Sequence, residues 1–466
     1  MASRILSQPA TMTFRRLTKQ ISPLANFPSV RMASKVATSK MPNIVLVDAA
    51  RTPFCMSGTH YKNLMAYDLM RGAMIELVSR TNLPKDALDH VTVGTVVQEA
   101  QTSNIAREAL LTAGFSDKVP AHTVTMACIS ANQAITSCMG LIATGQADTT
   151  IAGGVEFLSD VPIRLSRGLR QKLMDMAKIK SAGGKITSLA SLKLKDIGLE
   201  PLGVSEFSSG ETMGHSADRL TSAFKVSRNE QDSYSIRSHT LAAKATKEGN
   251  LSDLFPFQVP GTTNVVSADN GIRVSTPEQM AKLRPAFVRP YGTVTAANSS
   301  FLTDGASAAL IMSEEKALEL GYKPKAYLRQ FVYVSQDPRE QLLLGPAYAT
   351  PAVLKKAGLN LSDIDVFEFH EAFAGQILAN LKALDSDWFA QKYMGRSTKV
   401  GVPQLEKFNL WGGSLSIGHP FGATGTRLVY HAAERLRKED GKYALVAACA
   451  AGGQGHGIIV ERYPSK

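Results

Sequence analysis

Hydrophobic positions follow two alternating patterns from residue 43 onward. Short runs rich in valine and isoleucine, at 43–47, 91–97 and 149–152, predict strands. Between them, 64–81 and 129–144 carry apolar residues at the three- and four-residue spacing of a helix. Because strands and helices take turns along the chain, the pattern indicates an α/β fold with much parallel strand pairing.

The second half of the chain repeats the order of the first. Residues 88–93 resemble 364–369, and a run that ends in Gly-Gly closes each half, at 151–154 and 450–453. Such internal similarity predicts two similar halves of one duplicated fold. The region 157–290 fits neither half, so we predict a first half at 41–156 that ends at 291–315, an inserted loop region at 157–290 and a second half at 316–466.

Composition places this pattern in a large globular chain. The residues are 44% hydrophobic and 20% charged, which is typical of a globular protein with a large core. The length of 466 residues predicts two to three domains. Four cysteines exclude a disulfide-rich scaffold. No stretch of about 18 residues is uniformly apolar, so the sequence offers no obvious membrane span. The open question is the net charge of +12.

Much of that charge lies in the first 40 residues. They hold seven basic side chains, six serines, four threonines and no acidic residue, and they lack a long apolar segment. This composition is typical of a mitochondrial transit peptide, so we predict one at 1–40 and exclude it from the fold. The alternative is a basic tail without a targeting role.

A second basic cluster lies at 164–195, with nine basic residues and one acidic residue, Asp175. Leu165, Leu169, Leu173 and Met176 form one stripe of a helix that we expect Gly183-Gly184 to break. A basic helix with an apolar stripe can lie on an anionic membrane, pack on its own protein or bind a partner subunit. The rest of the chain carries a net −3, so we do not expect nucleic acid as a partner.

Two cysteines and two histidines lie where chemistry is expected. Cys128 stands at the predicted junction of a strand and a helix, where the helix N-terminus favours a thiolate. Cys449 precedes a glycine-rich loop, His370 follows a predicted strand, and His419 lies in a segment with five glycines at 412–425. A Cys/His site is plausible, although each residue alone is more often structural. We expect Cys55 and Cys138 to be structural thiols.

A series of motifs, read in order, resembles the thiolase family over residues 43–463. They are Ala50-Arg51-Thr52-Pro53, the Cys128 segment, Gly153-Gly154-Val155-Glu156, the segment 292–298, His370-Glu371-Ala372-Phe373, Gly418-His419-Pro420 and the Cys449 loop. The resemblance implies two βαβαβαββ halves in α/β/α/β/α layers. It also implies a mitochondrial 3-ketoacyl-CoA thiolase of fatty-acid β-oxidation, an acyltransferase that needs no metal or other cofactor and uses CoA as a substrate.

The resemblance also assigns roles. Cys128 is the expected nucleophile, His419 its base, Cys449 the second acid and base, and His370 a donor to the enolate, through a water. The N–H groups of Cys128 and Ala451 are expected to hold the acyl oxyanion. Met213, Phe287, Ala296 and Ser300 are expected to contact CoA. Many thiolases have asparagine at the position of His370, and glycine at that of Ala451.

The histidine form, with the basic insert, resembles thiolases that act as the β subunit beside a hydratase/dehydrogenase α subunit. The resemblance therefore implies a thiolase homodimer core, a hetero-oligomer with that α subunit, and a place on the matrix face of the inner membrane, which 164–195 would contact. An acetoacetyl-CoA thiolase and a 3-ketoacyl synthase-like condensing enzyme remain alternatives. The second cysteine, Cys449, favours thiolase over synthase.

Overall fold

The computed structural model describes residues 41–193, 197–200 and 205–464. The expected transit peptide at 1–40 and residues 194–195 of the basic segment lie outside these described residues. Along the first half, the elements are β1 (Ile44–Arg51), α1 (Ala66–Thr81), β3 (His90–Gly94), α2 (Ile105–Thr112), β4 (Ala121–Val124), α3 (Ser130–Ala143), β5 (Thr149–Glu156) and β10 (Thr303–Ser313). This order is βαβαβαββ.

The second half follows the same order, except that no strand forms in the described residues between its last two helices, α12 and α13. Its elements are β11 (Ala326–Ser335), α10 (Gly345–Ala357), β12 (Val366–Phe369), α11 (Ala374–Leu384), α12 (Asp387–Tyr393), α13 (Thr424–Lys438), β13 (Tyr443–Ala450) and β14 (Gln454–Arg462). A single parallel bridge between Phe367 and Phe408 stands where the first half has the β3–β4 pair. The expected duplication is confirmed.

The strands of both halves form one continuous hydrogen-bonded path in the order β12-β13-β14-β11-β1-β10-β5-β3-β4. Strand β1 joins the halves, because it pairs antiparallel with β10 and also with β11 through Val45 and Leu46. The pairs β3–β4, β3–β5 and β12–β13 are parallel. Parallel strands place their carboxyl ends at the same edge, where loops can meet over a site.

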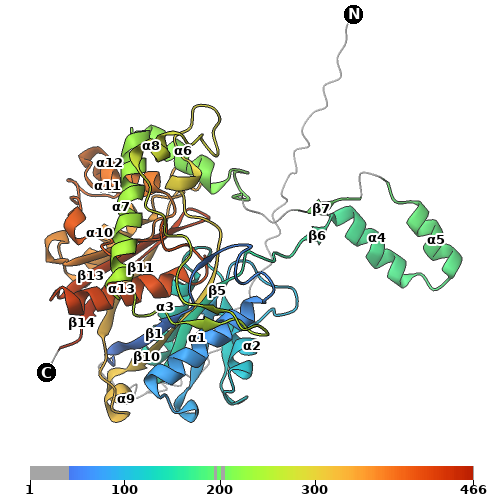
Figure 1. The fold of residues 1–466 in the computed structure, drawn as a ribbon, viewed down its shortest axis with the longest axis horizontal. Coiled ribbons are helices and arrows are strands. Elements are labelled where there is room, and N and C mark those ends of the chain that lie inside the picture. The colour runs from blue at the N-terminus through green and yellow to red at the C-terminus, as the bar shows by residue number, and fades with distance from the viewer. Residues whose placement is uncertain (1–40, 194–196, 201–204, 465–466) are drawn as a thin grey trace, which may run out of the picture. The chain divides into compact units, whose positions relative to one another are not determined.

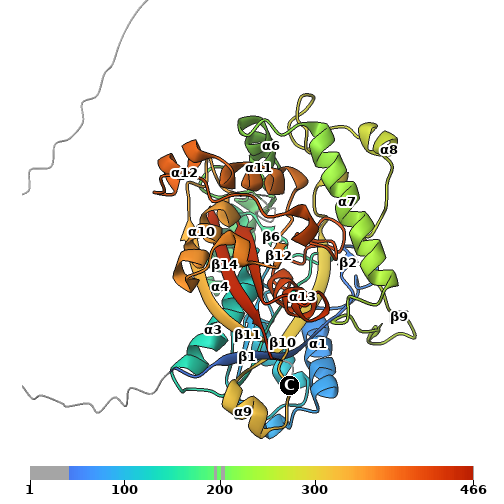
Figure 2. The ribbon, with the colours of Figure 1, turned by 90° about the vertical axis from the view of Figure 1, so that its left-hand side faces the viewer.

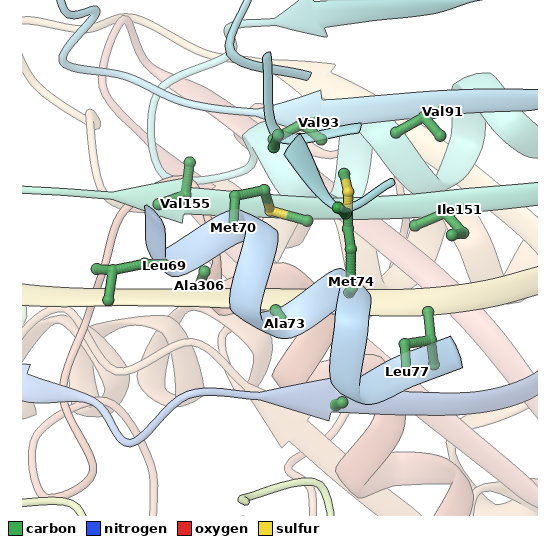
Figure 3. Packing of buried hydrophobic residues seen from close by; sticks show 14 of the residues in the cluster. Leu69, Met70, Ala73, Met74, Leu77, Val91, Val93, Ile151, Val155 and Ala306 are labelled. Atoms are coloured by element: carbon green, nitrogen blue, oxygen red, sulfur yellow. The ribbon is translucent and has the colours of Figure 1, made fainter. Parts of the chain in front are cut away.

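Helix α1 shows why the apolar spacing produces this packing. Leu69, Met70, Ala73, Met74 and Leu77 share one face of the helix and are fully buried. Figure 3 shows this face against side chains of three neighbouring strands: Val91 and Val93 of β3, Ile151 and Val155 of β5, and Ala306 of β10. Each buried aliphatic side chain contributes about 1.5–3 kcal/mol. The predicted helix at 64–81 is confirmed, with its start at Ala66.

Helices α3 and α13 occupy the middle of the fold. Helix α3 packs on β3 and β5, α13 packs on β12 and β13, and the two helices contact each other. Gly425 of α13 makes this close approach possible. A Cβ atom at that position would lie only 2.2 Å from the side chain of Asn132 on α3. With α1 and α2 on one side and α10 and α11 on the other, the layers run α/β/α/β/α (Figures 1 and 2).

The inserted region lies between β5 and β10. Its larger helices are α6 (Met213–Ala223) and α7 (Arg228–Lys247), followed by the short α8 (Pro277–Ala281). Before them come β6 (Arg164–Leu165), α4 (Arg167–Lys178), α5 (Ala182–Ala190) and β7 (Leu199–Glu200). Short strands β2 (Cys55–Met56), β8 (Phe257–Gln258) and β9 (Val265–Val266) and helix α9 (Glu314–Glu319) complete the main elements.

The basic segment forms a pair of helices, α4 and α5, which pack on each other (Figure 1). The expectation that Gly183-Gly184 breaks the helix is wrong in detail. Helix α4 ends at Lys178, and the glycines lie in the first turn of α5, which Ser181 caps through the backbone N–H of Gly184. Neither helix contains a buried residue. Among the described residues, no helix is long and apolar enough to cross a membrane.

Candidate active site

Four side chains converge from the ends of different elements. Cys128 lies between β4 and α3, His370 directly after β12, His419 in the loop before α13, and Cys449 near the end of β13. The ligand atoms of Cys128, His370 and His419 all lie within 4.8 Å of one another. Cys449 lies close enough to Cys128 that a charge on Cys128 raises the pKa of the Cys449 thiol, in addition to the larger effect of burial. The structure therefore brings together all four residues that the sequence singled out.

A tight turn presents Cys128. The preceding residue, Ala127, has φ of +46°, a left-handed conformation that is strained for a residue with a side chain. Ser130 secures the turn, since its hydroxyl accepts from the N–H of Met126 at 2.8 Å and donates to the carbonyl of Ala127 at 2.7 Å. Because α3 begins at Ser130, the sulfur lies at the N-terminal end of that helix.

Burial, and secondarily the charge of Glu156, raises the pKa of the Cys128 thiol to about 12. The backbone N–H groups of Ala451 and of Cys128 itself act in the opposite direction. Burial therefore opposes the stabilisation of a thiolate that the helix N-terminus provides, and it favours the thiol form. The two N–H groups beside the sulfur are also the ones expected to stabilise an oxyanion.

Hydrogen bonds define the proton position on His419. Its Nδ1 lies 2.7 Å from the Thr424 hydroxyl, which itself donates to the carbonyl of Pro420 at 3.0 Å. Since the proton of the Thr424 hydroxyl is used there, its oxygen accepts from Nδ1–H. The lone pair is then on Nε2, which has no hydrogen-bond partner among the described residues. Burial, with His370 and Arg427, holds the pKa of His419 well below its usual range.

His370 has the opposite arrangement. Its Nδ1 lies 3.0 Å from the Ser414 hydroxyl, and that oxygen accepts from Nη2 of Arg427 at 3.2 Å. The hydroxyl proton of Ser414 is free to point at Nδ1, which leaves the ring proton on Nε2. Burial and the Arg427 charge lower the pKa of His370 to about 3. One neutral histidine thus offers a base and the other offers a donor, with ring centroids 4.0 Å apart.

Glu156 connects the first half of the fold to the loop that carries His419. Its carboxylate accepts from the backbone N–H groups of Val96 at 3.2 Å, Val97 at 2.9 Å and Gly422 at 3.0 Å. Burial raises the pKa of Glu156 to about 8. Glycine is also required at position 154, two residues earlier, because a Cβ atom there would lie 1.7 Å from the carbonyl oxygen of Gly422.

Sequence analysis did not identify the residues that orient the two histidines. Ser414 and Thr424 lie inside the glycine-rich segment 412–425, and Arg427 follows it, so their position in the sequence was a signal. Glu156 was part of a motif but had no role assigned. The four cysteines are free. Cys55 is buried in one hydrophobic core, and Cys138, on α3, is buried in a second core against which Cys128 packs.

The residues expected to contact CoA border the segment that follows His370. Phe287 packs edge-on against Phe373 at 6.1 Å and covers Gly214, next to Met213 at the start of α6. The N–H of Ser300 donates to the carbonyl of Ala372 at 3.0 Å. Ala296 lines a cavity of about 400 Å³ together with Ser299, Phe301 and others. All four are exposed or half-buried, so their side chains are accessible.

Comparisons with known proteins agree with this arrangement. Residues 44–315 match the family model described as thiolase, N-terminal domain, and 322–462 match thiolase, C-terminal domain. The mouse mitochondrial trifunctional enzyme subunit beta is 66% identical over 445 residues, which cover 95% of this chain and 94% of the mouse protein.

Two solved structures also superpose on most of the chain. The acetyl-CoA acetyltransferase of Bacillus anthracis gives a TM-score of 0.79 at 31% identity and covers 91% of this chain and 99% of its own. Human mitochondrial 3-ketoacyl-CoA thiolase gives a TM-score of 0.78 at 29% identity. The match covers 91% of this chain and 100% of the human chain. With two matched family domains and relatives along nearly the whole length, the chain belongs to the thiolase family.

Proposed function

We propose that this chain cleaves 3-ketoacyl-CoA with CoA, yielding acetyl-CoA and an acyl-CoA shortened by two carbons. The observation that carries the proposal is the convergence of two cysteines with two buried histidines whose Nδ1 atoms contact different hydroxyl groups, an arrangement that favours opposite tautomers. One nitrogen accepts a proton, one N–H donates, one thiol can attack and a second thiol can exchange a proton. A reaction that expels a carbon anion needs each of these groups.

In the first half-reaction, the sulfur of Cys128 attacks the 3-keto carbon while its proton passes to Nε2 of His419. The N–H groups of Cys128 and Ala451 stabilise the resulting oxyanion. The bond between carbons 2 and 3 then breaks, which leaves an acyl group on Cys128 and the enolate of acetyl-CoA. His370 Nε2–H, through a water, and protonated His419 stabilise the enolate oxygen, and the Cys449 thiol protonates its carbon.

The second half-reaction returns the protein to its initial state. The Cys449 thiolate takes the proton from the thiol of CoA, and the CoA sulfur attacks the acyl group on Cys128. The acyl–Cys128 bond breaks, and the departing Cys128 sulfur recovers the proton held by His419. Met213, Phe287, Ala296 and Ser300 are the proposed CoA contacts. CoA is a substrate in this scheme, which uses no other cofactor.

Similar proteins suggest the setting of this activity. The mouse relative is named as the mitochondrial beta subunit of a trifunctional enzyme. By this similarity we place the chain in the mitochondrion, in fatty-acid β-oxidation, with a transit peptide at 1–40. We also propose a homodimeric core, an α subunit that carries hydratase and dehydrogenase activities, and the division into halves and insert predicted from the sequence.

A chain-length series of thiolysis assays tests the activity. We expect turnover of 3-ketoacyl-CoA substrates, including long-chain ones, and none by Cys128→Ala. Activity confined to the four-carbon substrate would instead indicate an acetoacetyl-CoA thiolase. Absence of thiolysis together with efficient condensation of acyl groups would indicate a synthase-like enzyme.

The basic helix pair supports a second proposal, peripheral contact with the anionic matrix face of the inner membrane. Leu173, Met174, Ile186 and Leu189 are 41%, 59%, 69% and 51% exposed on helices that also carry lysines and arginines. Apolar side chains can enter the lipid boundary while the basic ones meet anionic headgroups. An apolar surface of the α subunit is the alternative occupant.

Flotation with cardiolipin vesicles distinguishes these outcomes. We expect Leu173→Glu combined with Leu189→Glu to reduce vesicle binding, whereas Leu318→Glu has no effect. Leu318 is a suitable control because it is an equally exposed leucine, 52%, on α9. If deletion of 164–195 leaves cardiolipin binding unchanged, the membrane proposal is wrong. Loss of binding to the α subunit alone would favour the partner.

A further inference from the structure

We propose that Cys128, His370 and His419 also form a capture site for a soft divalent metal ion, for which Zn²⁺ is the natural candidate. The bound ion would hold the nucleophile and inhibit the protein reversibly. It is an inhibitor and not a cofactor of the proposed reaction. The metal binding is independent of the proposed thiolysis, whereas the inhibition rests on it.

The donor set is the first argument. One thiolate and two imidazole nitrogens are ligands that Zn²⁺ prefers, with a fourth position left open to water. The three ligand atoms lie within 4.8 Å of one another. Around a tetrahedral zinc ion, such donors are about 3.3–3.6 Å apart, as follows from Zn–N and Zn–S bond lengths. Modest side-chain rotations can close this difference, since the ring centroids of His370 and His419 already lie 4.0 Å apart.

The second argument is that both imidazoles are held from behind. Nδ1 of His370 contacts the Ser414 hydroxyl, and Nδ1 of His419 contacts the Thr424 hydroxyl. Both Nε2 atoms are buried and lack a hydrogen-bond partner among the described residues. A metal-bound histidine needs this arrangement, since its other ring nitrogen donates to a supporting oxygen that fixes the ring.

Binding requires a defined movement of protons. The S–H bond of Cys128 breaks, a metal–sulfur bond forms, and one proton leaves to solvent. His419 already has its lone pair on Nε2. His370 moves its ring proton from Nε2 to Nδ1, where the Ser414 oxygen can accept it. The positive ion then stabilises a buried thiolate that the protein alone does not favour.

The described residues contain no second cluster of three such ligands. The nearest comparable feature is the pair His90 and His122, whose Nε2 and Nδ1 atoms lie 2.9 Å apart at the surface. Two histidines without a cysteine make a weaker site that lacks a sulfur ligand. His90→Gln is therefore a matched control that removes a histidine pair and leaves the proposed site intact.

Titration of the full-length protein with Co²⁺, in buffer free of thiols and chelators, tests the site. We expect one Co²⁺ per chain, with the sulfur-to-cobalt absorption of a thiolate ligand and the visible bands of tetrahedral cobalt. Cys128→Ser should remove the sulfur band. His370→Asn and His419→Asn should each weaken binding by more than the roughly 10–100-fold that loss of a supporting outer-shell contact costs. His90→Gln should leave the spectrum unchanged. Zn²⁺ should displace cobalt and protect Cys128 from iodoacetamide.

The results separate the two proposals. A cobalt spectrum without a sulfur band, or one that Cys128→Ser leaves intact, overturns the metal site, as does its loss in His90→Gln. A thermal melt of each variant shows whether lost binding reflects misfolding, and His370→Asn and His419→Asn provide two independent removals of a ligand. If cobalt binds through Cys128 and thiolysis continues undiminished, the metal site stands and the proposed function fails. Inhibition that EDTA reverses supports both.

Discussion

The Thr424 hydroxyl is the contact that sets the protonation of His419, and Thr424→Val removes it at almost constant volume. In the wild type, Nδ1–H of His419 donates to this hydroxyl at 2.7 Å, inside a fully buried environment. In the variant, the same N–H has no acceptor. A buried polar group without a partner costs about 1–3 kcal/mol.

That cost falls on one tautomer only. His419 can avoid it by moving the proton to Nε2, but Nε2 then cannot accept the proton of Cys128. A penalty of about 1–3 kcal/mol therefore reduces the competent tautomer by about 5–150-fold, and we expect acylation of Cys128 to slow by about that factor. Thr424→Ser keeps the hydroxyl and its bond to Pro420, so it should retain most of the activity.

The assay is stopped-flow measurement of the first turnover with a 3-ketoacyl-CoA, followed by the rate at which iodoacetamide alkylates Cys128. Both rates should fall together in Thr424→Val and recover in Thr424→Ser. Thermal melts establish that each variant is folded. If folded Thr424→Val acylates within about twofold of the wild-type rate, the assignment of the base tautomer from this hydrogen bond is refuted.

Three further predictions concern the stability of the fold. Glu156→Gln loses part of the acceptor for three N–H groups, so it should cost about 1–3 kcal/mol in denaturant unfolding, and an unchanged midpoint would contradict this. Ala127→Val, with a branched side chain at positive φ, should lower the thermal midpoint, whereas Ala127→Gly should raise it; the reverse order would refute the strain. Burial raises the pKa of Asp253, but Arg51 and His431 outweigh burial and hold that pKa well below its usual range. The ionised carboxylate should therefore stabilise the folded state above about pH 4, and this stabilisation should be lost as the pH falls. Asp253→Asn leaves Arg51 paired with Asp269 alone, so it should cost about 1–3 kcal/mol at neutral pH and flatten the dependence of stability on acid pH. A pH dependence equal to that of the wild type would exclude this pair as its source.

Local sequence pattern was sufficient for most of the fold. The apolar spacing of 64–81 predicted α1 because its buried face is continuous, and the repeat of 88–93 at 364–369 marked strands β3 and β12. The end of α4 was misplaced because glycine was treated as a helix breaker. In the structure, the serine at position 181 caps the next helix and the glycines follow inside its first turn.

The site was predicted by residue type and place, but its proton positions were not. Cys128, Cys449, His370 and His419 stand at element ends that a linear pattern can locate. The tautomers depend on Ser414, Thr424 and Arg427, whose contacts arise only when the loop folds back over α13. The pKa of Cys128 was beyond the sequence for a similar reason. Helix position is visible in the sequence, whereas the burial that raises the pKa depends on the tertiary packing.

Mass spectrometry of Cys449→Ala after incubation with a long-chain 3-ketoacyl-CoA tests the central claim most directly. If Cys128 is the nucleophile and Cys449 exchanges protons in both half-reactions, this variant should accumulate one acyl group on the peptide that contains Cys128. Steady-state thiolysis should be lost at the same time. An acyl group on another residue, or normal turnover by the variant, would contradict the account.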